Sequence, residues 1–336
     1  MSGRPLAGMR VAVTGGTGFL GRHLLPALLA AGATVTCIAR PSSDTSRLPG
    51  KVRVALADLE HGTGLAEILA GQDALIHMAA LLFGLGWQDY LESNARAARS
   101  LARAICSLPE RPHVTLVSSL AATGPCGSAP GAAENSGLAP VSAYGWSKLL
   151  CERIFSGIPD AFPAIVRPPI IYGSGDRGLL PVFRAAARGL GISPGLGRDF
   201  PVSLIHASDV ARAIVLLCER RASGIYHVND GAIHDMASFC RAMGRAQGRA
   251  NLRVLRVPLP VMGACAWLSG AMASALPRAV MRGAPGLNPD KYREARAAGW
   301  LCDASRIARE HGFAPAMPLE RGLEEAVAGY RGEGWL

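Results

Sequence analysis

The segment "VAVTGGTGFLGRHLL", residues 11–25, constrains the fold of this chain more than any other stretch. A short β-branched run ends in glycines, and a stretch with helical periodicity follows, so a strand, a turn and a helix are expected in that order. Gly15, Gly18 and Gly21 are spaced three residues apart, and Gly16, Gly18 and Gly21 also fit G-x-G-x-x-G. Such glycines allow a tight turn, close approach of the backbone to a diphosphate, and close packing of helix on strand. The segment predicts a dinucleotide-binding loop, with the diphosphate at the helix N-terminus.

Apolar runs and helical stretches alternate through the first half of the chain. A helix is expected from about Trp87 to Ser107, and another that contains Tyr144. This alternation predicts an α/β fold of the Rossmann type, in which a doubly wound parallel sheet is covered by helices on both faces. The runs expected as strands after the first one are 34–40, 52–59, 73–80, 113–119 and 162–169.

A second region begins near Gly173, where glycine and proline become frequent. Residues 208–220 and 224–230 have the patterns of a helix and a strand that return to the sheet. The chain after Asp230 indicates helices and loops without clear strand alternation. The expected division is into two intertwined parts, a dinucleotide-binding domain and a smaller, mixed α/β substrate-binding domain. Their residues are 1–173 with 203–228, and 174–202 with 229–336, respectively.

The composition argues against several classes of protein. The net charge is +10, but the arginines are scattered without a basic run or interleaved aromatic residues, so nucleic-acid binding is not expected. The eight cysteines show neither a CxxC pair nor His/Cys ligand spacing, so no metal site is predicted. Nothing before the first strand resembles a secretory signal, and the cysteines are expected to be reduced thiols in the cytoplasm.

Residues 257–277 carry no charged side chain and are long enough to cross a bilayer. However, Pro258, Pro260 and Gly263 crowd the start of this stretch, and serine and glycine dilute it. We expect a buried helix beside a ligand pocket rather than a membrane span. Peripheral contact with a membrane stays open as an alternative.

The residue at the end of the second expected strand selects the cofactor. An acidic residue there would bind the ribose 2′-hydroxyl of NAD, whereas an arginine can accommodate the 2′-phosphate of NADP. This chain has Arg40, with Ser43 close behind it and Asp44 later in the loop. A guanidinium beside hydroxyl groups suits a phosphate, so NADP is preferred and NAD stays an alternative. Asp58 and Leu59, after the third strand, are expected in the adenine pocket, and an ordinary aspartate at a strand end is the alternative for Asp58.

A second group of candidate residues lies in and near "YGWSK", which contains Lys148, one of three lysines in the chain. On a helix, Tyr144 and Lys148 lie on one face. A nearby ammonium lowers the pKa of a phenol from its usual value near ~10. The compact ammonium group of a lysine can also bind the two hydroxyls of a ribose. Ser118 and Ser119 end the fifth strand, at the edge where open α/β sheets bind ligands, and a serine there can hold a carbonyl oxygen beside the tyrosine.

These residues match a known family. The chain resembles the extended short-chain dehydrogenase/reductases over almost its full length, through "TGGTGFLG", "ADL", "IHMAA", "VSSLAATG", "YGWSK", "RPPIIYG" and "IHASDVARA". The resemblance implies that Ser119, Tyr144 and Lys148 are the catalytic residues. Ser118 is the alternative serine, and Asn94 would have a structural or proton-relay role.

The resemblance also bears on the cofactor and on assembly. It implies a homodimer formed through the helices at 88–107 and 142–157. The residues expected to bind the cofactor are Gly15, Thr17, Gly18, Phe19, Leu20, Gly21, Arg40, Ser43, Asp58, Leu59, His77, Ala79, Ala80, Ser118, Tyr144, Lys148, Pro168 and Ile170.

Three departures separate the chain from the sugar-nucleotide epimerases and dehydratases of this family. Those enzymes usually carry an asparagine after the strand that here reads "RPPIIYG", Arg-Asp-Tyr before Ile-His, and, in dehydratases, Asp-Glu after the catalytic serine. The chain has Pro169, Val202-Ser203-Leu204 and Leu120-Ala121 at these positions. It resembles more closely the members similar to 3β-hydroxysteroid dehydrogenase and dihydroflavonol reductase, and segments 81–87 and 257–277 offer apolar walls.

The sequence therefore predicts an NADP(H)-dependent oxidoreductase that interconverts an alcohol and a ketone on a largely apolar small molecule by a Ser-Tyr-Lys mechanism. Two alternatives stay open: a nucleotide-sugar epimerase or dehydratase with tightly bound NAD, and a noncatalytic NADP(H) sensor. Tyr172 and Arg177 are candidate substrate contacts. His206 is expected to be a contact at the sheet edge, and Asp209 a residue at a helix N-terminus.

Overall fold

A parallel sheet of seven strands forms the centre of the computed structural model, which describes residues 6–275 and 286–336. The strand order is β11-β6-β5-β4-β1-β2-β3, so the chain builds one half of the sheet outward from β1 and then crosses over to build the other. This order confirms the doubly wound fold expected from the sequence. The strands are β1 (Arg10–Thr14), β2 (Thr34–Ala39), β3 (Arg53–Leu56), β4 (Ala74–His77), β5 (His113–Val117), β6 (Ala164–Arg167) and β11 (Gly224–His227).

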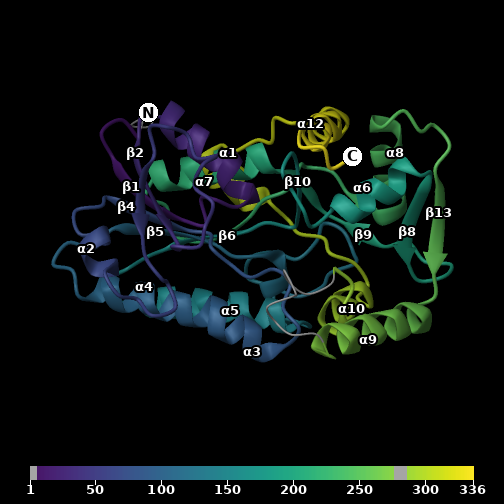
Figure 1. Ribbon diagram of the computed structural model, residues 1–336, viewed down its shortest axis with the longest axis horizontal. Coiled ribbons are helices and arrows are strands. Elements are labelled where there is room, and N and C mark those ends of the chain that lie inside the picture. The colour runs from purple at the N-terminus through teal and green to yellow at the C-terminus, as the bar shows by residue number, and fades with distance from the viewer. Residues whose placement is uncertain (1–5, 276–285) are drawn as a thin grey trace.

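Helices cover both faces of this sheet (Figure 1). On one face, α1 (Phe19–Ala30) and α7 (Ala207–Glu219) pack against each other and share an aliphatic core with the strands. On the other face lie α4 (Arg96–Cys106) and α5 (Ala143–Ser156), with the short α2 (Leu65–Leu69) next to α4. Because both faces are covered, β1, β4 and β5 are buried over almost their whole length, as is usual for central parallel strands.

The helix expected from about Trp87 to Ser107 is present but not uniform. It consists of α3 (Trp87–Tyr90), a π-helical turn η1 (Leu91–Ala95) and α4. Isolated π-helical turns inside α-helices are frequently found at functional sites. This turn contains Asn94, one of the residues singled out from the sequence.

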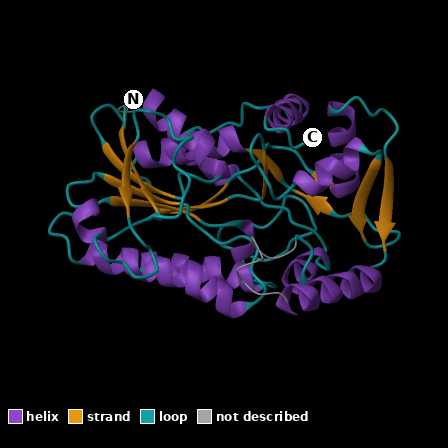
Figure 2. Cartoon of the chain, in the orientation of Figure 1, coloured by secondary structure: helices purple, strands orange, loops and turns teal. Residues whose placement is uncertain are grey.

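The second region lies at one end of the molecule and combines helices with pairs of short strands (Figure 2). Its elements are α6 (Leu180–Ala187), β8 (Leu190–Pro194), β9 (Pro201–Val202), β12 (His234–Asp235), α8 (Met236–Ala246), β13 (Arg253–Val257) and α12 (Leu319–Gly332). The short strands β7 (Ile170–Tyr172) and β10 (Leu204–His206) lie where the chain leaves and re-enters the sheet region, and α11 (Ser305–His311) packs on β11 of the central sheet. β13 pairs with β8, β12 with β9, and β10 with β7. The strands after Asp230 were not expected, because β12 is very short and two arginines interrupt the apolar pattern of β13.

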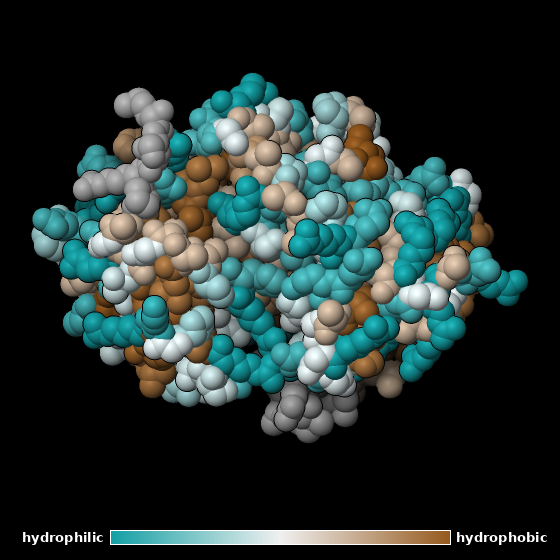
Figure 3. All heavy atoms as spheres, turned by 90° about the horizontal axis from the view of Figure 1, so that it is seen from above, coloured by the Kyte–Doolittle hydropathy of each residue, from teal (hydrophilic) through white to brown (hydrophobic). Residues whose placement is uncertain are grey.

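Helix α9 (Leu259–Ala275) overturns the expectation of a buried helix at 257–277. In the described part of this stretch, which ends at Ala275, only small residues are buried, and Trp267 has 69% of its surface exposed. α9 packs against α10 (Pro289–Ala295) at the lower edge of Figure 1. The surface on the opposite side, over α12 and α8, is mainly hydrophilic (Figure 3). No helix within residues 6–275 and 286–336 is long and apolar enough to cross a membrane.

Candidate active site

A large cavity lies at the carboxyl ends of the central strands, between the glycine loop and α10. Its volume is about 690 Å³, within the range of about 300–1,000 Å³ that is typical of ligand sites. Its walls come from the β1–α1 loop, the residues after β2, β3, β4 and β5, and helices α5 and α10. Open α/β sheets bind ligands at this edge, where the strand order reverses.

The glycine loop fits closely against the neighbouring backbone. Gly15 has a φ of +78°, and a Cβ atom there would lie 2.7 Å from the backbone nitrogen of Ala79. A Cβ atom on Gly21 would overlap the carbonyl oxygen of Gly16, so α1 can begin this close to β1 only without a side chain at that position. Gly18 precedes α1 and lines the cavity. The free N–H groups of the helix N-terminus are therefore available to a diphosphate.

Most residues expected to bind the cofactor line this one cavity. From the glycine loop and the ends of β2 and β3 they are Gly15, Thr17, Gly18, Phe19, Leu20, Arg40, Ser43, Asp58 and Leu59. From β4 onward they are Ala79, Ala80, Ser118, Tyr144, Lys148, Pro168 and Ile170. Residues that are distant in the sequence thus line one cavity, which includes both the glycine loop and Lys148. Gly21 does not line this cavity, because its role is the packing of α1 on the loop.

His77 does not lie where the sequence analysis expected it. Its side chain is buried and does not line the cavity. Its Nδ1 lies 2.7 Å from Oγ1 of Thr14, and its ring packs on Phe155. Burial, helped by the charge of Lys148, lowers the pKa of His77 to about 3. The ring is therefore neutral and contributes to packing between β1, β4 and α5.

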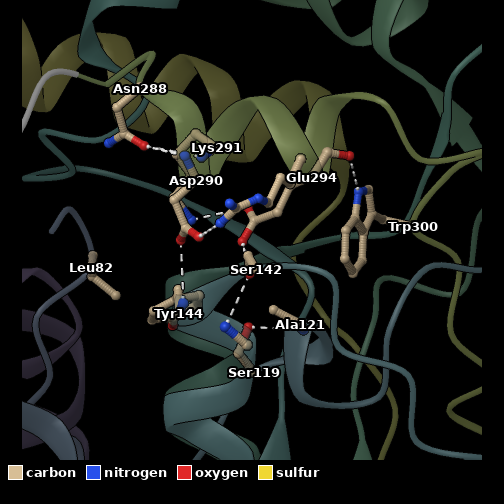
Figure 4. Close-up of polar contacts among 12 residues, drawn as sticks. Leu82, Ser119, Ala121, Ser142, Tyr144, Asn288, Asp290, Lys291, Glu294 and Trp300 are labelled. Atoms are coloured by element: carbon tan, nitrogen blue, oxygen red, sulfur yellow. Dashed lines mark hydrogen bonds and ion pairs between the residues drawn. The ribbon is translucent and has the colours of Figure 1, made fainter. Parts of the chain in front are cut away.

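Ser119, Tyr144 and Lys148 all line the cavity. Ser119 lies on the turn after β5, close to Tyr144 (Figure 4). Ser118 points elsewhere, because its hydroxyl donates a hydrogen bond to the carboxylate of Glu152. The geometry therefore distinguishes the two serines and leaves Ser119 as the one beside the tyrosine.

Gly145 allows this close approach of serine and tyrosine. The short turn η2 (Leu120–Ala122) follows Ser119 and packs directly against α5. A Cβ atom on Gly145 would overlap the carbonyl oxygen of Ala121 in that turn. The glycine of "YGWSK" thus has a packing role on which the position of Tyr144 depends.

The pKa of the tyrosine differs from the expectation. Tyr144 is buried, and this raises its pKa above the usual range; the nearby hydroxyl of Ser119 opposes the shift and the charge of Glu294 adds to it. Lys148 does not reverse this rise in the pKa of Tyr144. Its Nζ donates a hydrogen bond to the carbonyl oxygen of Val117 at 2.6 Å, and burial lowers its own pKa. The phenol is therefore protonated at neutral pH and can act as a proton donor.

Helix α10 holds the N-terminal end of α5 (Figure 4). The carboxylate of Asp290 accepts hydrogen bonds from the backbone N–H groups of Ala143 and Tyr144, at 2.6 and 3.2 Å. The carboxylate of Glu294 accepts one from the hydroxyl of Ser142 at 2.7 Å. Negative charge is stabilised at a helix N-terminus by the free N–H groups and the helix dipole. The tyrosine is thus positioned by contacts from both regions of the chain.

Lys291 brings a second ammonium group to the cavity. Its Nζ lies 4.5 Å from the ring centre of Tyr144 and 5.7 Å from that of Phe83, and it donates a hydrogen bond to Glu294 at 2.9 Å. A cation above an aromatic face is attracted by the ring's quadrupole. Helix α10 was not predicted from the sequence. Two signals pointed to it: Asn288, which caps the helix, and the rarity of lysine in this chain.

Asn94 holds the loop that forms another wall of the cavity. Its Oδ1 accepts a hydrogen bond from the N–H of Leu81 at 2.7 Å. Its Nδ2 donates to the carbonyl oxygen of Leu81 at 3.2 Å and to the hydroxyl of Ser147 at 3.0 Å. Asn94 itself is buried and does not line the cavity. Of the two roles considered, this geometry supports the structural one, because Asn94 attaches the loop to α5.

A buried ion pair lies behind the serine and the tyrosine. Nε and Nη2 of Arg167, on β6, donate to the two carboxylate oxygens of Glu152, on α5, at 2.9 and 2.6 Å. The same carboxylate accepts the hydroxyl of Ser118, and Nη1 of Arg167 donates to the hydroxyl of Thr123 at 3.0 Å. A bidentate pair fixes orientation as well as distance. It therefore sets the position of α5 relative to the ends of β5 and β6.

The remaining candidates lie away from the cavity. Tyr172 is fully buried against the ring of His206, and the guanidinium of Arg177 stacks on the ring of Trp335. Neither Tyr172 nor Arg177 lines the cavity, so the expectation that they contact substrate is not supported. Asp209 lies in the first turn of α7, which His206 precedes.

Similar known proteins identify the family of this chain. A family model described as the NAD dependent epimerase/dehydratase family matches residues 11–229. The chain belongs to this family. A ceramide reductase of Caulobacter vibrioides is 30% identical, over 97% of this chain and 96% of that protein. A 4-hydroxy-2-methyl-3-oxo-4-farnesyl-3,4-dihydroquinoline-1-oxide ketoreductase of Stigmatella aurantiaca is 29% identical, over 97% of this chain and 98% of that protein.

The epimerase/dehydratase fold is also shared with sugar-nucleotide enzymes. The structure of DesIV, a dTDP-glucose 4,6-dehydratase from Streptomyces venezuelae with NAD and TYD bound, matches with a TM-score of 0.77 at 22% identity, over 97% of this chain and 98% of that one. At this identity the likeness shows the fold alone. The family and its reductase relatives show that the chain is an NAD(P)-dependent oxidoreductase of the extended short-chain dehydrogenase/reductase class, as its motifs predicted.

Replacing Glu152 by glutamine should destabilise this epimerase/dehydratase family member, because the guanidinium of Arg167 is left buried without its counter-charge. We expect the free energy of unfolding, measured by urea denaturation, to fall by about 3–5 kcal/mol. The control is Glu310→Gln, which removes the carboxylate from the partly exposed pair with Arg306 and should cost less than about 1 kcal/mol. Equal effects of the two substitutions would contradict the structural role of the buried pair.

Proposed function

We propose that this enzyme uses NADPH to reduce a ketone on a largely apolar molecule, and oxidises the corresponding alcohol in the reverse direction. The observation that carries the proposal is the position of Ser119 beside Tyr144 at the wall of the cavity, with Lys148 one helical turn further along α5. When a carbonyl carbon gains hydride, its oxygen must gain a proton. A phenol that stays protonated at neutral pH suits this direction.

Each of the three residues has a separate task in this reaction. When bound, the nicotinamide supplies the hydride to the carbonyl carbon. The hydroxyl of Ser119 donates a hydrogen bond to the carbonyl oxygen and holds it beside the phenol. Tyr144 gives its proton to that oxygen as negative charge develops there. The ammonium of Lys148 binds the ribose hydroxyls and stabilises the phenolate that remains. In this mechanism, the activation barrier is lowered mainly by positioning of the reacting groups and by preorganised hydrogen bonds.

The adenosine end of the cavity favours NADP over NAD. Arg40 and Ser43 line the cavity beyond the end of β2, where a 2′-phosphate is bound in this type of fold. Asp44 is turned into its own loop, because it accepts hydrogen bonds from the N–H and the hydroxyl of Ser46 at 3.0 and 2.6 Å. The charged group that the end of β2 presents to the cavity is therefore a cation.

The substrate part of the cavity combines apolar walls with one charged pair. Phe83, Phe200 and Trp300 contribute aromatic surface, and Lys291 with Glu294 contributes the pair. By their names, the two relatives act on a ceramide and on a farnesyl quinoline oxide. Each of these molecules joins a long apolar part to a compact polar end. We infer that the substrate also joins a long apolar part to a compact polar end, with the apolar part against the aromatic walls and the polar end at Lys291.

Tyr144→Phe should abolish turnover while leaving NADPH binding unchanged, because it removes the proton donor and keeps the ring. We expect a loss of about 10²–10⁴-fold in kcat, measured by NADPH oxidation with apolar ketones, and an unchanged Kd by fluorescence titration. Tyr90→Phe is the matched control: its ring lies 5.9 Å from that of Tyr144, and its hydroxyl binds only backbone groups of Leu82 and Gly84 in the described contacts. This control should retain most activity.

Two results would contradict the proposed reaction. Full activity in Tyr144→Phe would remove Tyr144 from the mechanism. Purified protein that carries stoichiometric NAD and turns over a UDP-sugar would instead identify a nucleotide-sugar epimerase.

Arg40→Asp should shift the cofactor preference from NADPH toward NADH, since a carboxylate repels a 2′-phosphate and can accept a hydrogen bond from a 2′-hydroxyl. We expect the ratio of the two Kd values to change by at least about tenfold, as the loss of a charge-assisted contact implies. Arg103→Asp makes the same charge change on the exposed side of α4 and should leave the ratio unaltered. Equal weakening of both cofactors by Arg40→Asp would mean that Arg40 does not contact the 2′-phosphate.

Lys291→Met keeps an unbranched side chain in the cavity and removes its charge. We expect KM to rise about tenfold for ketones with an oxygen-rich polar end, the size expected for one hydrogen bond to a charged group. KM for an apolar ketone without that end should not change. Lys51→Met, at an exposed lysine outside the cavity, is the control. An equal rise for both ketones would point to a distorted cavity and contradict a role of Lys291 in recognition.

A further inference from the structure

The outer face of α9 differs from an ordinary protein surface. From Val257 to Ala275 the chain has no charged side chain, and Trp267, Leu268 and Met272 are 69%, 55% and 62% exposed. Single exposed apolar residues are common, but a charge-free helix with its large side chains in solvent is not. Hydrophilic residues predominate on the opposite side of the molecule, over α12 and α8 (Figure 3).

The packing of α9 explains why its large side chains point outward. A Cβ atom on Gly263 would lie 2.8 Å from the ring of Tyr292, and one on Gly270 would lie 2.8 Å from the ring of Pro289. α9 thus meets α10 through its small residues, and this close contact leaves no room for bulky ones between the helices. The large apolar side chains are left on the other face, where contact with water is unfavourable.

We infer that this face of α9 docks the enzyme on a membrane surface, at the boundary between lipid headgroups and acyl chains. α9 has 17 residues and, like the other described helices, does not meet the requirements for crossing a bilayer. It would therefore lie parallel to the membrane, as interfacial helices do. Trp267 suits this depth, because the indole joins an apolar body to a polar N–H and tryptophan is enriched at membrane interfaces.

The charges next to α9 favour an anionic membrane. The net charge of the chain is +10, and β13, which leads into α9, carries the exposed Arg253 and Arg256. Arg256 pairs with the exposed Asp199 at 3.0 Å, which reduces its share of the attraction. Leu255 on β13 and its neighbour Ile192 on β8 are 51% and 50% exposed, so the apolar surface continues past the helix. Basic residues beside apolar ones are the combination that binds anionic lipid.

Docking through α9 would bring the cavity next to the lipid. α10, on which α9 packs, contributes Lys291 and Glu294 to the cavity wall. Leu82 on another wall is 50% exposed, and Trp87, 48% exposed, begins α3, which lies along the same lower edge of Figure 1 as α9. An apolar ketone would then pass from the bilayer to the cavity with little exposure to water. The passage of a ketone from the bilayer to the cavity rests on the proposed function, whereas the docking of α9 on the membrane does not.

Vesicle binding tests the proposal. The enzyme is sedimented with vesicles of phosphatidylglycerol and phosphatidylcholine, and with vesicles of phosphatidylcholine alone. We expect stronger binding to the anionic vesicles. In Trp267→Glu/Leu268→Glu the partition coefficient should fall by at least about tenfold, because two carboxylates must enter the interface. The matched control, Leu138→Glu/Phe162→Glu, makes the same charge change at two exposed apolar residues elsewhere and should bind like the wild type.

A fluorescent probe on the helix gives a second readout that does not depend on these variants. Cys265 on α9 and Cys106 at the end of α4 are both exposed. An environment-sensitive fluorophore can be attached to either one after the other is replaced by serine. With anionic vesicles, emission from the probe on Cys265 should shift to shorter wavelength, and emission from the probe on Cys106 should not.

Three results would overturn the proposal: no vesicle binding by the wild type, equal binding by both double variants, or no spectral shift at Cys265. A dimer in sedimentation velocity that only the α9 variant loses, with vesicle binding unchanged, would identify α9 as an interface between two copies instead. Turnover of a water-soluble ketone is measured in parallel. It depends on the cavity and not on α9, so failure of the docking and failure of the proposed reaction are distinguishable.

Discussion

The position of α5, the helix that carries Tyr144 and Lys148, depends on one buried pair of charges. Arg167 and Glu152 join β6 to α5 where water is excluded, and the cost of burying both charges is offset only while their mutual contacts and additional hydrogen bonds are complete. Ser118 and Thr123 supply those additional bonds, so the end of β5 and the turn after it are tied to the same pair. This explains why the neighbouring serines have different environments. The hydroxyl of Ser118 is hydrogen-bonded to Glu152 of the buried pair, whereas Ser119 lies beside the tyrosine.

A second set of contacts fixes the same helix at its beginning. Asp290 and Glu294 on α10 accept hydrogen bonds from the N-terminal end of α5, and α10 also forms a wall of the cavity. The sheet region therefore supplies Tyr144, while the second region supplies the groups that hold it in place. A change in the cavity wall that α10 forms therefore also affects the position of Tyr144, because one helix serves both.

Short sequence motifs were sufficient to predict those parts of the site that a single segment of the chain forms. The glycine loop, Arg40 at a strand end, and Tyr144 with Lys148 on one helix follow from spacing, and the structure places them along one cavity. His77 was expected at the cofactor from the family resemblance, but its side chain is buried by contacts with Thr14 and with Phe155, which is distant in the sequence. The pKa of Tyr144 depends on burial and on Glu294, which is distant in the sequence. The burial of α9 was misjudged because apolar composition does not reveal what packs against a segment.

Two of the three lysines in the chain, Lys148 and Lys291, line the same cavity, while Lys51 is exposed on the surface. Nearly all other positive charge is carried by arginine, whose guanidinium stays protonated. Amines can condense with ketones and aldehydes to form imines, whereas a protonated guanidinium does not form an imine with a simple ketone. The arginine-rich surface therefore offers few groups that form imines with a simple ketone. The side-chain amines of this protein are concentrated where a carbonyl substrate would arrive.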